Sequence, residues 1–433
     1  MSLFIFARLE PKAGDENRLR EELTRVIEPT RAEPGCLRIH FYESTREPLV
    51  FYIHSEWTDD AAFDAHIQMP HTQRFVEAAE QLTTEPIKAL RTKQQEAAAR
   101  KGSPSPEIVF ETLIAYQRSA ALRAAIELDL FRAVGEGPGD VASLARQCGA
   151  SQRGIRILCD YLTIYGLLNK QDGHYSHTDS SRMFLDPRSP ASIASAARFL
   201  AHPNMQEPYE HLTEAVRSGR TVLPGDGSVQ PENPIWVEFA HGMAPMMAPT
   251  AGPLGAIVLE GISGPLRVLD IAAGHGLFGI EVAKLNAQAE ITALDWAAVL
   301  EVAKSNARKA GVEGRYHTLP GSAFEVDYGG PYDIVLLTNF LHHFAPAVCV
   351  GVLRKVRAAL KPGGRAAALE FVPNEDRISP PMAAAFSMTM LASTASGDAY
   401  TFRELEAMYR EAGFSRVTRQ AIPRSPHEVV MGT

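Results

Sequence analysis

Cysteine is scarce in this chain, and long apolar runs are missing. Four cysteines occur among 433 residues, and no two of them lie close together. Because cysteine zinc sites and disulfide frameworks need closely spaced pairs, we expect no metal site and no disulfides, as in a cytoplasmic protein. No run approaches the ~20 apolar residues of a membrane helix. Charged residues (Arg8, Glu10 and Lys12) interrupt the apolar start, so no membrane contact and no signal peptide are expected.

Positive charge is also in short supply. The chain has 43 Lys and Arg against 51 Asp and Glu, a net charge of -8. A protein that binds the phosphate backbone of nucleic acids needs a basic surface, so we expect no nucleic-acid partner. Hydrophobic residues (45%) and charged residues (22%) are those of a globular protein. A chain of this length exceeds one ordinary core, which predicts two or three domains.

The first segment, residues 1–92, alternates short strands and helices. Its opening run Leu3–Leu9 alternates in polarity, and Leu19 and Leu23 follow at helical spacing. Asp59 and Asp60 can cap a later helix. The predicted elements are a strand at 3–9, a helix at 14–28, strands at 36–43 and 49–57 joined by a turn at 46–48, helices at 59–67 and 75–82, and a strand at 86–90. This order predicts an α+β domain with helices on one face of an antiparallel sheet.

The rest of the chain divides into a linker and three further parts. Residues 93–106 are polar and rich in Ser, Pro and Gly, which predicts a linker. Residues 107–190 are mostly helical, with a helix pair followed by a small β-wing. Residues 191–264 form a helical connector. From 265 to 433 strands and helices alternate, which predicts an α/β domain with a parallel, doubly wound sheet.

A glycine-rich turn follows the first strand of this last domain. Gly274, Gly276 and Gly279 have the spacing of a dinucleotide fingerprint, and Asp295 lies about 20 residues further on. Asp270, however, ends the strand, and its carboxylate would repel a pyrophosphate resting on the turn. The same carboxylate would attract the sulfonium and ammonium groups of S-adenosylmethionine. The pattern therefore favours this cofactor, with a nicotinamide oxidoreductase as the alternative; Asp295 can accept the ribose hydroxyls in either case.

Two histidines, His342 and His343, follow the strand Ile334–Leu337. Open α/β sheets bind ligands at the carboxyl ends of their strands, so a functional role is favoured over simple packing. The next strand ends in Glu370. The helix before the α/β domain carries an apolar, adaptable stripe that we expect to line the acceptor pocket, although each member can equally pack as core: Trp236, Phe239, Met243, Met246 and Met247.

The last domain contains five motifs: LDIAAGHG, ITALDW, LLTNFLHHF, LKPGG and EAGF. On these motifs, residues 107–433 resemble the plant-type and bacterial class I S-adenosylmethionine-dependent O-methyltransferases, which join a winged-helix dimerisation domain to a Rossmann-like domain. The resemblance implies His342 as general base, Glu370 as the acid that orients it, and His343 as a lesser candidate. It implies these cofactor-binding positions: Asp270, Gly274, Gly276, Asp295, Trp296, Ser322, Ala323, Phe324, Thr338 and Asn339.

The chain departs from this family at three positions. The family usually has Gly-Asp after the third strand, where this chain has Gly321-Ser322. A lysine common four residues before the catalytic histidine is Thr338. The second orienting acid falls near Thr401-Phe402, where no acid stands. Among the acceptor residues, Phe239 and Met243 match a family Phe-x-x-x-Met pattern.

The resemblance implies a homodimer that methylates a hydroxyl of a small aromatic or polyketide-like secondary metabolite. Carbon methylation of a similar acceptor is the alternative, because relatives do both. A winged-helix regulator would place Ser151–Tyr161 on DNA, but that stretch offers only Arg153 and Arg156, opposed by Asp160. Dimerisation is therefore favoured over DNA binding.

The motifs RAEPGCL, SEW and AHxxxPHTQRF lie in residues 1–92. They resemble the antibiotic biosynthesis monooxygenase-like domain, a dimeric ferredoxin-like fold. This implies either a cofactor-free monooxygenase of quinols or polyphenols, or a non-catalytic dimerisation module. Trp57, His66 and His71 can line a pocket or serve as packing and capping residues, and no catalysis is assigned to them.

Overall fold

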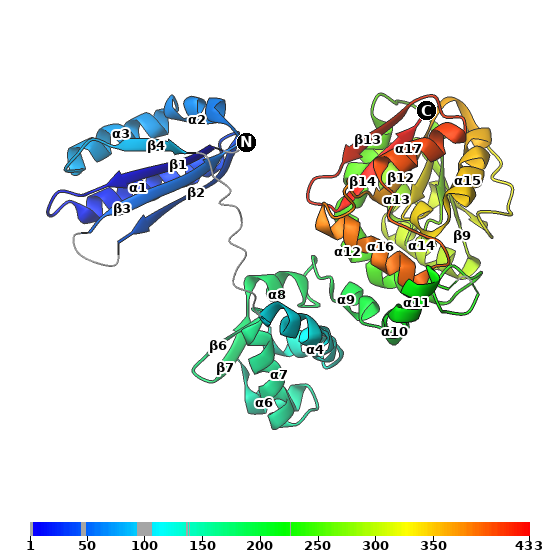
Figure 1. Ribbon diagram of the computed structural model, residues 1–433, viewed down its shortest axis with the longest axis horizontal. Coiled ribbons are helices and arrows are strands. Elements are labelled where there is room, and N and C mark those ends of the chain that lie inside the picture. The colour runs from blue at the N-terminus through cyan, green and yellow to red at the C-terminus, as the bar shows by residue number, and fades with distance from the viewer. Residues whose placement is uncertain (1–2, 45–48, 93–105, 136, 138, 226) are drawn as a thin grey trace. The chain divides into compact units, whose positions relative to one another are not determined.

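The structure, a computed structural model, describes residues 3–44, 49–92, 106–135, 137, 139–225 and 227–433. The chain forms two compact units, Met1–Val109 and Phe110–Thr433, which are described separately (Figure 1). The predicted turn at 46–48 and nearly all of the predicted linker lie outside the described residues.

The first unit is a four-stranded antiparallel sheet in the order β2-β3-β1-β4, with helices on one face. Its elements are β1 (Leu3–Leu9), α1 (Glu16–Arg31), β2 (Cys36–Glu43), β3 (Phe51–Trp57), α2 (Asp60–Ile67), α3 (Pro70–Leu82) and β4 (Lys88–Thr92). Alternate residues of β1 are buried, as its polarity pattern predicts. The last strand lies two residues later than expected, because its pairing with β1 runs from Lys88 to Thr92.

The second unit begins with a helical domain that carries a three-stranded wing, β5-β7-β6. Its elements are α4 (Glu107–Glu127), α5 (Leu130–Val134), β5 (Gly139–Asp140), α6 (Val141–Gln147), α7 (Gln152–Ile164), β6 (Leu168–Gln171), β7 (His174–His177) and α8 (Asp179–Phe184). Ser151 caps α7 by accepting a hydrogen bond from the Gly154 amide. Asp172 and Gly173 both have positive φ, as a tight two-residue hairpin turn requires. The predicted helix pair and wing are present.

Four helices connect this domain to the large sheet: α9 (Ala194–Leu200), α10 (Pro203–Glu210), α11 (Leu212–Ser218) and α12 (Ile235–Leu259). Within the described part of the chain, α12 is the one helix long and apolar enough to cross a membrane, by length and composition alone. Half of its apolar window is buried, and it packs against α9, α13 and α14. A core helix of a globular domain can be equally long and apolar, and the packing of α12 is that of a core helix.

The α/β domain contains a seven-stranded sheet in the order β10-β9-β8-β11-β12-β14-β13. Its elements are β8 (Leu266–Ile271), α13 (Leu277–Leu285), β9 (Ala289–Asp295), α14 (Ala297–Lys309), η1 (Glu313–Arg315), β10 (Tyr316–Pro320), β11 (Tyr332–Thr338), η2 (Leu341–His343), α15 (Pro346–Ala359), β12 (Leu360–Phe371), α16 (Pro381–Ser393), α17 (Phe402–Glu411), β13 (Val417–Ala421) and β14 (His427–Gly432). The expectation of a wholly parallel sheet needs one correction. Strand β14 returns directly from β13 as a hairpin and therefore runs antiparallel to both of its neighbours.

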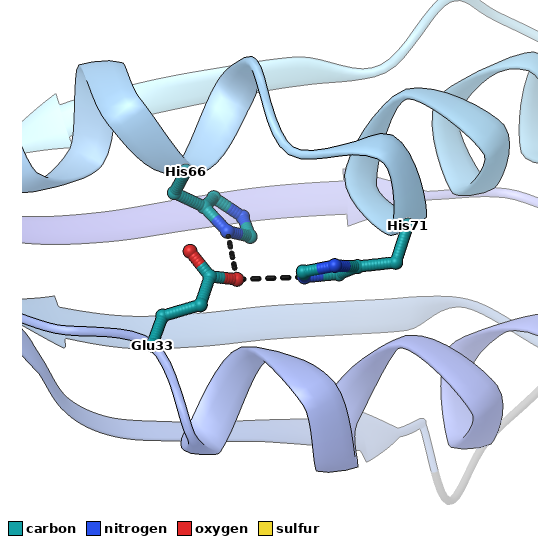
Figure 2. A group of neighbouring side chains, drawn as sticks. All are labelled: Glu33, His66 and His71. Atoms are coloured by element: carbon teal, nitrogen blue, oxygen red, sulfur yellow. Dashed lines mark hydrogen bonds and ion pairs between the residues drawn. The ribbon is translucent and has the colours of Figure 1, made fainter.

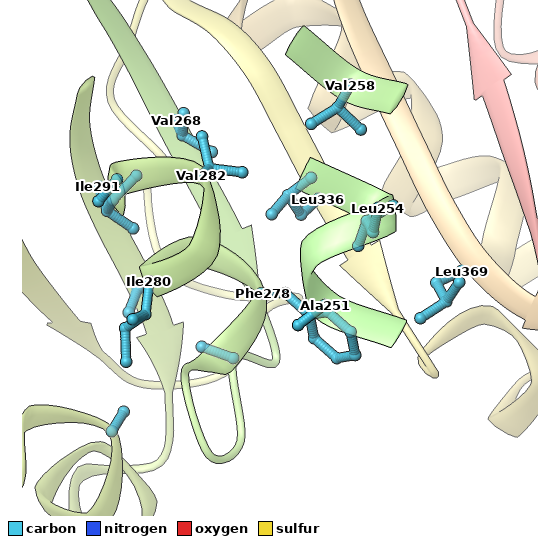
Figure 3. Packing of buried hydrophobic residues seen from close by; sticks show 14 of the residues in the cluster. Ala251, Leu254, Val258, Val268, Phe278, Ile280, Val282, Ile291, Leu336 and Leu369 are labelled. Carbon is cyan, nitrogen blue, oxygen red and sulfur yellow. The ribbon is translucent and has the colours of Figure 1, made fainter. Parts of the chain in front are cut away.

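Hydrophobic cores cover both faces of this sheet. One core joins the strands to α12, α13 and α14, and the other joins them to α15 and α17. Figure 3 shows Leu254 and Val258 of α12 near Val268, Leu336 and Leu369 of three strands. Strands buried on both faces are nearly continuous apolar runs, which explains why these segments show no alternation of polarity. The carboxyl ends of β8, β9, β11 and β12 consequently lie along one edge of the sheet.

Candidate active site

The glycine turn after β8 lies against the residue that ends β9. The Gly274 amide donates to Asp295 Oδ2 at 2.8 Å, and the Trp296 amide donates to Asp295 Oδ1 at 2.7 Å. Gly276 has φ 75°, and a Cβ there would lie 2.5 Å from the Tyr316 hydroxyl and 2.9 Å from Ala303 Cβ. A side chain at position 276 is therefore excluded by both conformation and space.

Asp295 keeps spare acceptor capacity. Each carboxylate oxygen accepts one backbone hydrogen bond here, and each has a second lone pair. Burial raises the pKa of Asp295 to about 6, against the lowering effect of the two amides. The side chain can therefore accept two hydroxyl groups of a nucleoside above that pH.

Asp270 lies beneath the glycine turn. Its side chain is fully buried, and Oδ2 accepts a hydrogen bond from the Gly279 amide at 3.1 Å, near the start of α13. Among the described residues, the buried Oδ1 has no hydrogen-bond partner, and neither has the nearby Tyr316 hydroxyl. Burial raises the pKa of Asp270 to about 7. Its predicted contact with the cofactor's positive groups stays a prediction; what the structure adds is that Asp270 holds the turn to the helix.

The other predicted cofactor positions lie at or after the ends of strands β10 and β11. Ser322 accepts a bond from the Phe324 amide at 3.2 Å, while Ala323 is buried and Phe324 is half exposed beside Phe344. Thr338 is buried at the end of β11. Asn339 has φ 53°, and its side-chain amide lies 3.9 Å from the sulfur of Met247 on α12.

His342 and Glu370 form a buried pair at the ends of β11 and β12. His342 Nδ1 lies 2.5 Å from Glu370 Oε2, and the two residues are 3% and 2% exposed. Glu370 Oε1 accepts from the Phe340 amide at 3.1 Å and the Leu341 amide at 2.8 Å. The carboxylate therefore holds the loop and keeps a proton on Nδ1, which leaves Nε2 with a free lone pair. Such a nitrogen can accept a proton from a bound substrate.

His343 lies beside this pair in an apolar setting. Its ring is 4.3 Å from that of His342 and edge-on to Trp236 at 5.3 Å. Its Nδ1 is buried and has no hydrogen-bond partner in the part of the chain that the structure describes. Burial, aided by His342, holds the pKa of His343 well below its usual range. A neutral ring without an acidic partner is a weaker candidate for the base.

The apolar stripe of α12 divides between the site and the core. Trp236 faces His343 and meets Phe239 edge-on at 5.7 Å. A Cβ at Gly274 would lie 3.9 Å from Phe239, so this ring borders the glycine turn. Met247 borders Asn339, whereas Met243 is packed in the core and Met246 is 39% exposed. Trp236 and Trp296 pack against the same small hydrophobic cluster. The expected acceptor-binding side of the site therefore adjoins the expected cofactor-binding side.

Three residues that sequence reasoning missed also lie here. Phe386 of α16 meets His342 edge-on at 4.8 Å. The ring of His427 on β14 lies 4.1 Å from the Phe371 ring, and its buried Nε2 has no hydrogen-bond partner within the described ranges. The hydroxyl of Tyr316 reaches the glycine turn. No sequence motif marks them: α16 carries Phe386, the antiparallel pairing of β14 with β12 brings in His427, and the parallel pairing of β10 with β9 places Tyr316.

Comparison with known proteins shows which family has this arrangement. Residues 238–415 match the O-methyltransferase domain, residues 110–187 the O-methyltransferase dimerisation domain, and residues 2–78 the antibiotic biosynthesis monooxygenase family. Acetylserotonin O-methyltransferase of Mus musculus is 32% identical over 353 residues, which cover 77% of this chain and 90% of the relative. The chain belongs to the O-methyltransferase family.

Further relatives agree with this placement. The 3-hydroxy-5-methyl-1-naphthoate 3-O-methyltransferase of Streptomyces sahachiroi is 29% identical over 74% of this chain and 94% of its own. The crystal structure of an assigned O-methyltransferase from Nostoc punctiforme PCC 73102 is 51% identical, with a TM-score of 0.74 over 76% of this chain and 99% of that one. Human N-acetylserotonin methyltransferase in complex with S-adenosylmethionine shares the fold at 21% identity, with a TM-score of 0.67 over 77% and 99% of the two chains.

The protein is thus an S-adenosylmethionine-dependent O-methyltransferase with a Rossmann-like catalytic domain, a helical dimerisation domain and an N-terminal ferredoxin-like domain. This confirms the fold class and the cofactor predicted from the sequence and sets the nicotinamide alternative aside. The site fits the cofactor, because the turn excludes a side chain at Gly276 and Asp295 has unused lone pairs.

Thr401 shows what replaces the family's second acid. It is the N-cap of α17, where its hydroxyl accepts from the Glu404 amide and the Glu404 carboxylate accepts from the Thr401 amide at 2.8 Å. The position is therefore occupied by a capping box. Among the described residues, Glu370 is the carboxylate that holds His342.

Proposed function

We propose that this methyltransferase acts on a hydroxyl of a small aromatic or polyketide-like secondary metabolite, with His342 as the general base. The buried His342–Glu370 pair supports this proposal most directly. A phenol with a pKa near 10 is barely ionised at neutral pH, so its proton must be removed as the oxygen attacks. The naphthoate acceptor in the name of the Streptomyces sahachiroi relative supports an aromatic substrate.

In the proposed mechanism, the cofactor supplies a methyl group bound to a sulfonium. Trp236 and Phe239 align the acceptor ring so that its oxygen faces this methyl carbon. The cofactor, when bound, would supply this methyl group and leave as an uncharged thioether; His342 Nε2 would take the proton of the acceptor hydroxyl as that oxygen is methylated. Glu370 stabilises the imidazolium that results. The remaining cofactor contacts are proposed for Asp270, Gly274, Asp295 and Trp296.

Hydroxylated aromatic acceptors test this function directly. The full chain, given methyl-labelled S-adenosylmethionine and a panel of hydroxynaphthoates and hydroxyanthraquinones, should place the label on a phenolic oxygen, located by mass spectrometry and NMR. Matched acceptors that carry a methoxy group in place of that hydroxyl should give no product. Label on a ring carbon would instead establish carbon methylation, and a panel with no methylated member would count against an aromatic acceptor.

We propose that the protein is a cytoplasmic homodimer. All four cysteines are free, which suits a reducing compartment. The dimerisation domain exposes large apolar side chains on α4, with Phe110, Leu113 and Tyr116 each more than 60% exposed. Apolar surface of this kind marks an interface, and a second copy of the same helix can cover it.

Leu113→Glu should therefore raise the dimer dissociation constant about 100-fold or more, because the dimer interface would bury an unpaired charge from each copy. Analytical ultracentrifugation over a concentration series measures the change. Val216→Glu is the matched control, since Val216 is 59% exposed on α11, outside the dimerisation domain. A Leu113→Glu protein that stays as dimeric as the Val216→Glu protein would show that α4 is not the interface.

We also propose domain boundaries at 1–92, 107–190, 191–264 and 265–433, with 93–106 as the linker. The ranges matched by the three family models, 2–78, 110–187 and 238–415, support this order of domains. The catalytic match begins at residue 238, so it includes most of α12 together with the α/β domain.

A further inference from the structure

A second cluster of reactive side chains lies in the N-terminal unit, outside the methyltransferase site (Figure 2). Glu33 follows α1, His66 lies on α2 and His71 lies near the start of α3. Within the described part of the chain, these are the three His, Cys or acidic residues that lie close enough together to hold a metal ion. Their ligand atoms all lie within 4.8 Å of one another. No spacing pattern in the chain joins Glu33 to the two histidines.

Both imidazoles point to the same carboxylate oxygen. Glu33 Oε1 lies 2.8 Å from His66 Nδ1 and 2.7 Å from His71 Nε2. The side chains of Glu33, His66 and His71 are 7%, 10% and 18% exposed. The cluster is therefore largely shielded from water, and His71 provides the most accessible approach to it.

The charges of this cluster favour a bound cation. A shielded carboxylate is costly unless positive charge or hydrogen-bond donors compensate it. In the described residues, the ion-pair partners of Glu33 are these two histidines. A neutral imidazole is the form that coordinates a metal ion, so two imidazoles beside one carboxylate can supply three ligand atoms to a cation.

We propose that Glu33, His66 and His71 bind one divalent transition-metal ion. Two imidazole nitrogens and one carboxylate oxygen are a set that suits Zn²⁺ or Fe²⁺ with coordination positions left open, whereas Ca²⁺ and Mg²⁺ prefer oxygen ligands. Metal–ligand bonds of about 2.1 Å require the ligand atoms to lie about 3.0–3.4 Å apart. The Glu33–histidine distances need to open by a few tenths of an ångström, and the two imidazole nitrogens, which lie within 4.8 Å of each other, need to reach the same range. The expectation of no metal site rests on the lack of closely spaced cysteines, and a site made of two histidines and one carboxylate needs no cysteine.

Neighbouring side chains hold the proposed ligands in place. The Trp57 ring lies 4.6 Å from the His66 ring, and the Trp57 indole donates to Ser55 Oγ at 2.9 Å. The contact with Trp57 orients His66 before a metal ion arrives, as the supporting residues of metal sites do. The Thr72 hydroxyl lies 3.2 Å from His66 Nδ1, the proposed ligand atom itself, so a bound metal ion would take its place.

Zn²⁺ alone serves as the probe, titrated into the full chain in competition with a chromophoric chelator. The wild type should bind one equivalent at this site, and His71→Ala should weaken binding at least about 100-fold, since changing a residue that merely supports a ligand already costs 10–100-fold. His317→Ala is the matched control, because it removes an exposed histidine paired with Glu290 at 2.7 Å. It should leave Zn²⁺ binding unchanged.

Glu33→Gln separates a metal site from a hydrogen-bonded cluster. Glutamine still accepts hydrogen bonds from both imidazoles, so the melting temperature without metal should stay close to that of the wild type, while Zn²⁺ affinity should fall at least about 10-fold. In the unaltered chain, Co²⁺ should give visible absorption bands that are absent from the His71→Ala protein. Wild-type Zn²⁺ binding no tighter than that of His71→Ala, or undiminished binding in Glu33→Gln, would overturn the proposal.

Discussion

Replacing His342 with Ala should lower kcat by about 10²–10⁴ while leaving the affinity for S-adenosylhomocysteine nearly unchanged. His342 is the buried imidazole whose Nδ1 is held by Glu370, so its loss removes the proposed proton acceptor. The glycine turn and Asp295, which form the cofactor side, are bonded to each other and not to His342. Steady-state kinetics and calorimetry on the same variant measure the two quantities.

Two neighbouring substitutions serve as controls for this result. Glu370→Gln should cost less than His342→Ala, because it alters the orientation and charge of the imidazole without removing it. His343→Ala should cost least, since His343 has no acidic partner and its pKa is held low by burial. Higher pH should partly restore the His342→Ala enzyme, because a phenol then ionises without a base. Near-normal turnover of His342→Ala would mean a more acidic acceptor, a carbon acceptor, or His343 as the base, and the double variant separates the last case.

Replacing Asp295 with Ala should weaken S-adenosylhomocysteine binding by ~1.5–3 kcal/mol, or about 10–150-fold, through the loss of charge-assisted hydrogen bonds. The structure adds a second reason, because the Gly274 and Trp296 amides lose their acceptor. Burial raises the pKa of Asp295 to about 6. Protonation removes the negative charge below that pH, so wild-type affinity should fall as the pH drops through 6, and Asp295→Ala should lack this part of the pH dependence.

Glu301→Gln is the matched control for the cofactor experiment. Glu301 is an exposed acid on α14 whose partner is Lys304, so its replacement should leave cofactor affinity unchanged. Isothermal titration calorimetry at several pH values makes both measurements. An Asp295→Ala protein that binds S-adenosylhomocysteine as tightly as the Glu301→Gln protein would show that Asp295 does not hold the ribose.

Local signals in the sequence were enough to predict the main parts of the catalytic domain. The helix Leu277–Leu285 begins directly after the glycine turn that the sequence shows, and its own apolar pattern spans it. The pairing of His342 with Glu370 is what the family resemblance implies. The structure explains it, because His342 lies in η2 after β11 and Glu370 lies near the end of β12, which pairs in parallel with β11.

Other parts of the site were decided by tertiary structure alone. Strand β14 inserts antiparallel beside β12, and this pairing brings His427 to Phe371. Packing under the glycine turn buries Asp270 completely, although its sequence motif is compatible with an exposed carboxylate. Glu33, His66 and His71 belong to three separate elements and converge only when two helices and a turn pack together. Caps, turns and periodicity act between residues close in the chain and can be recognised in the sequence, whereas these contacts join distant segments and depend on how whole elements pack.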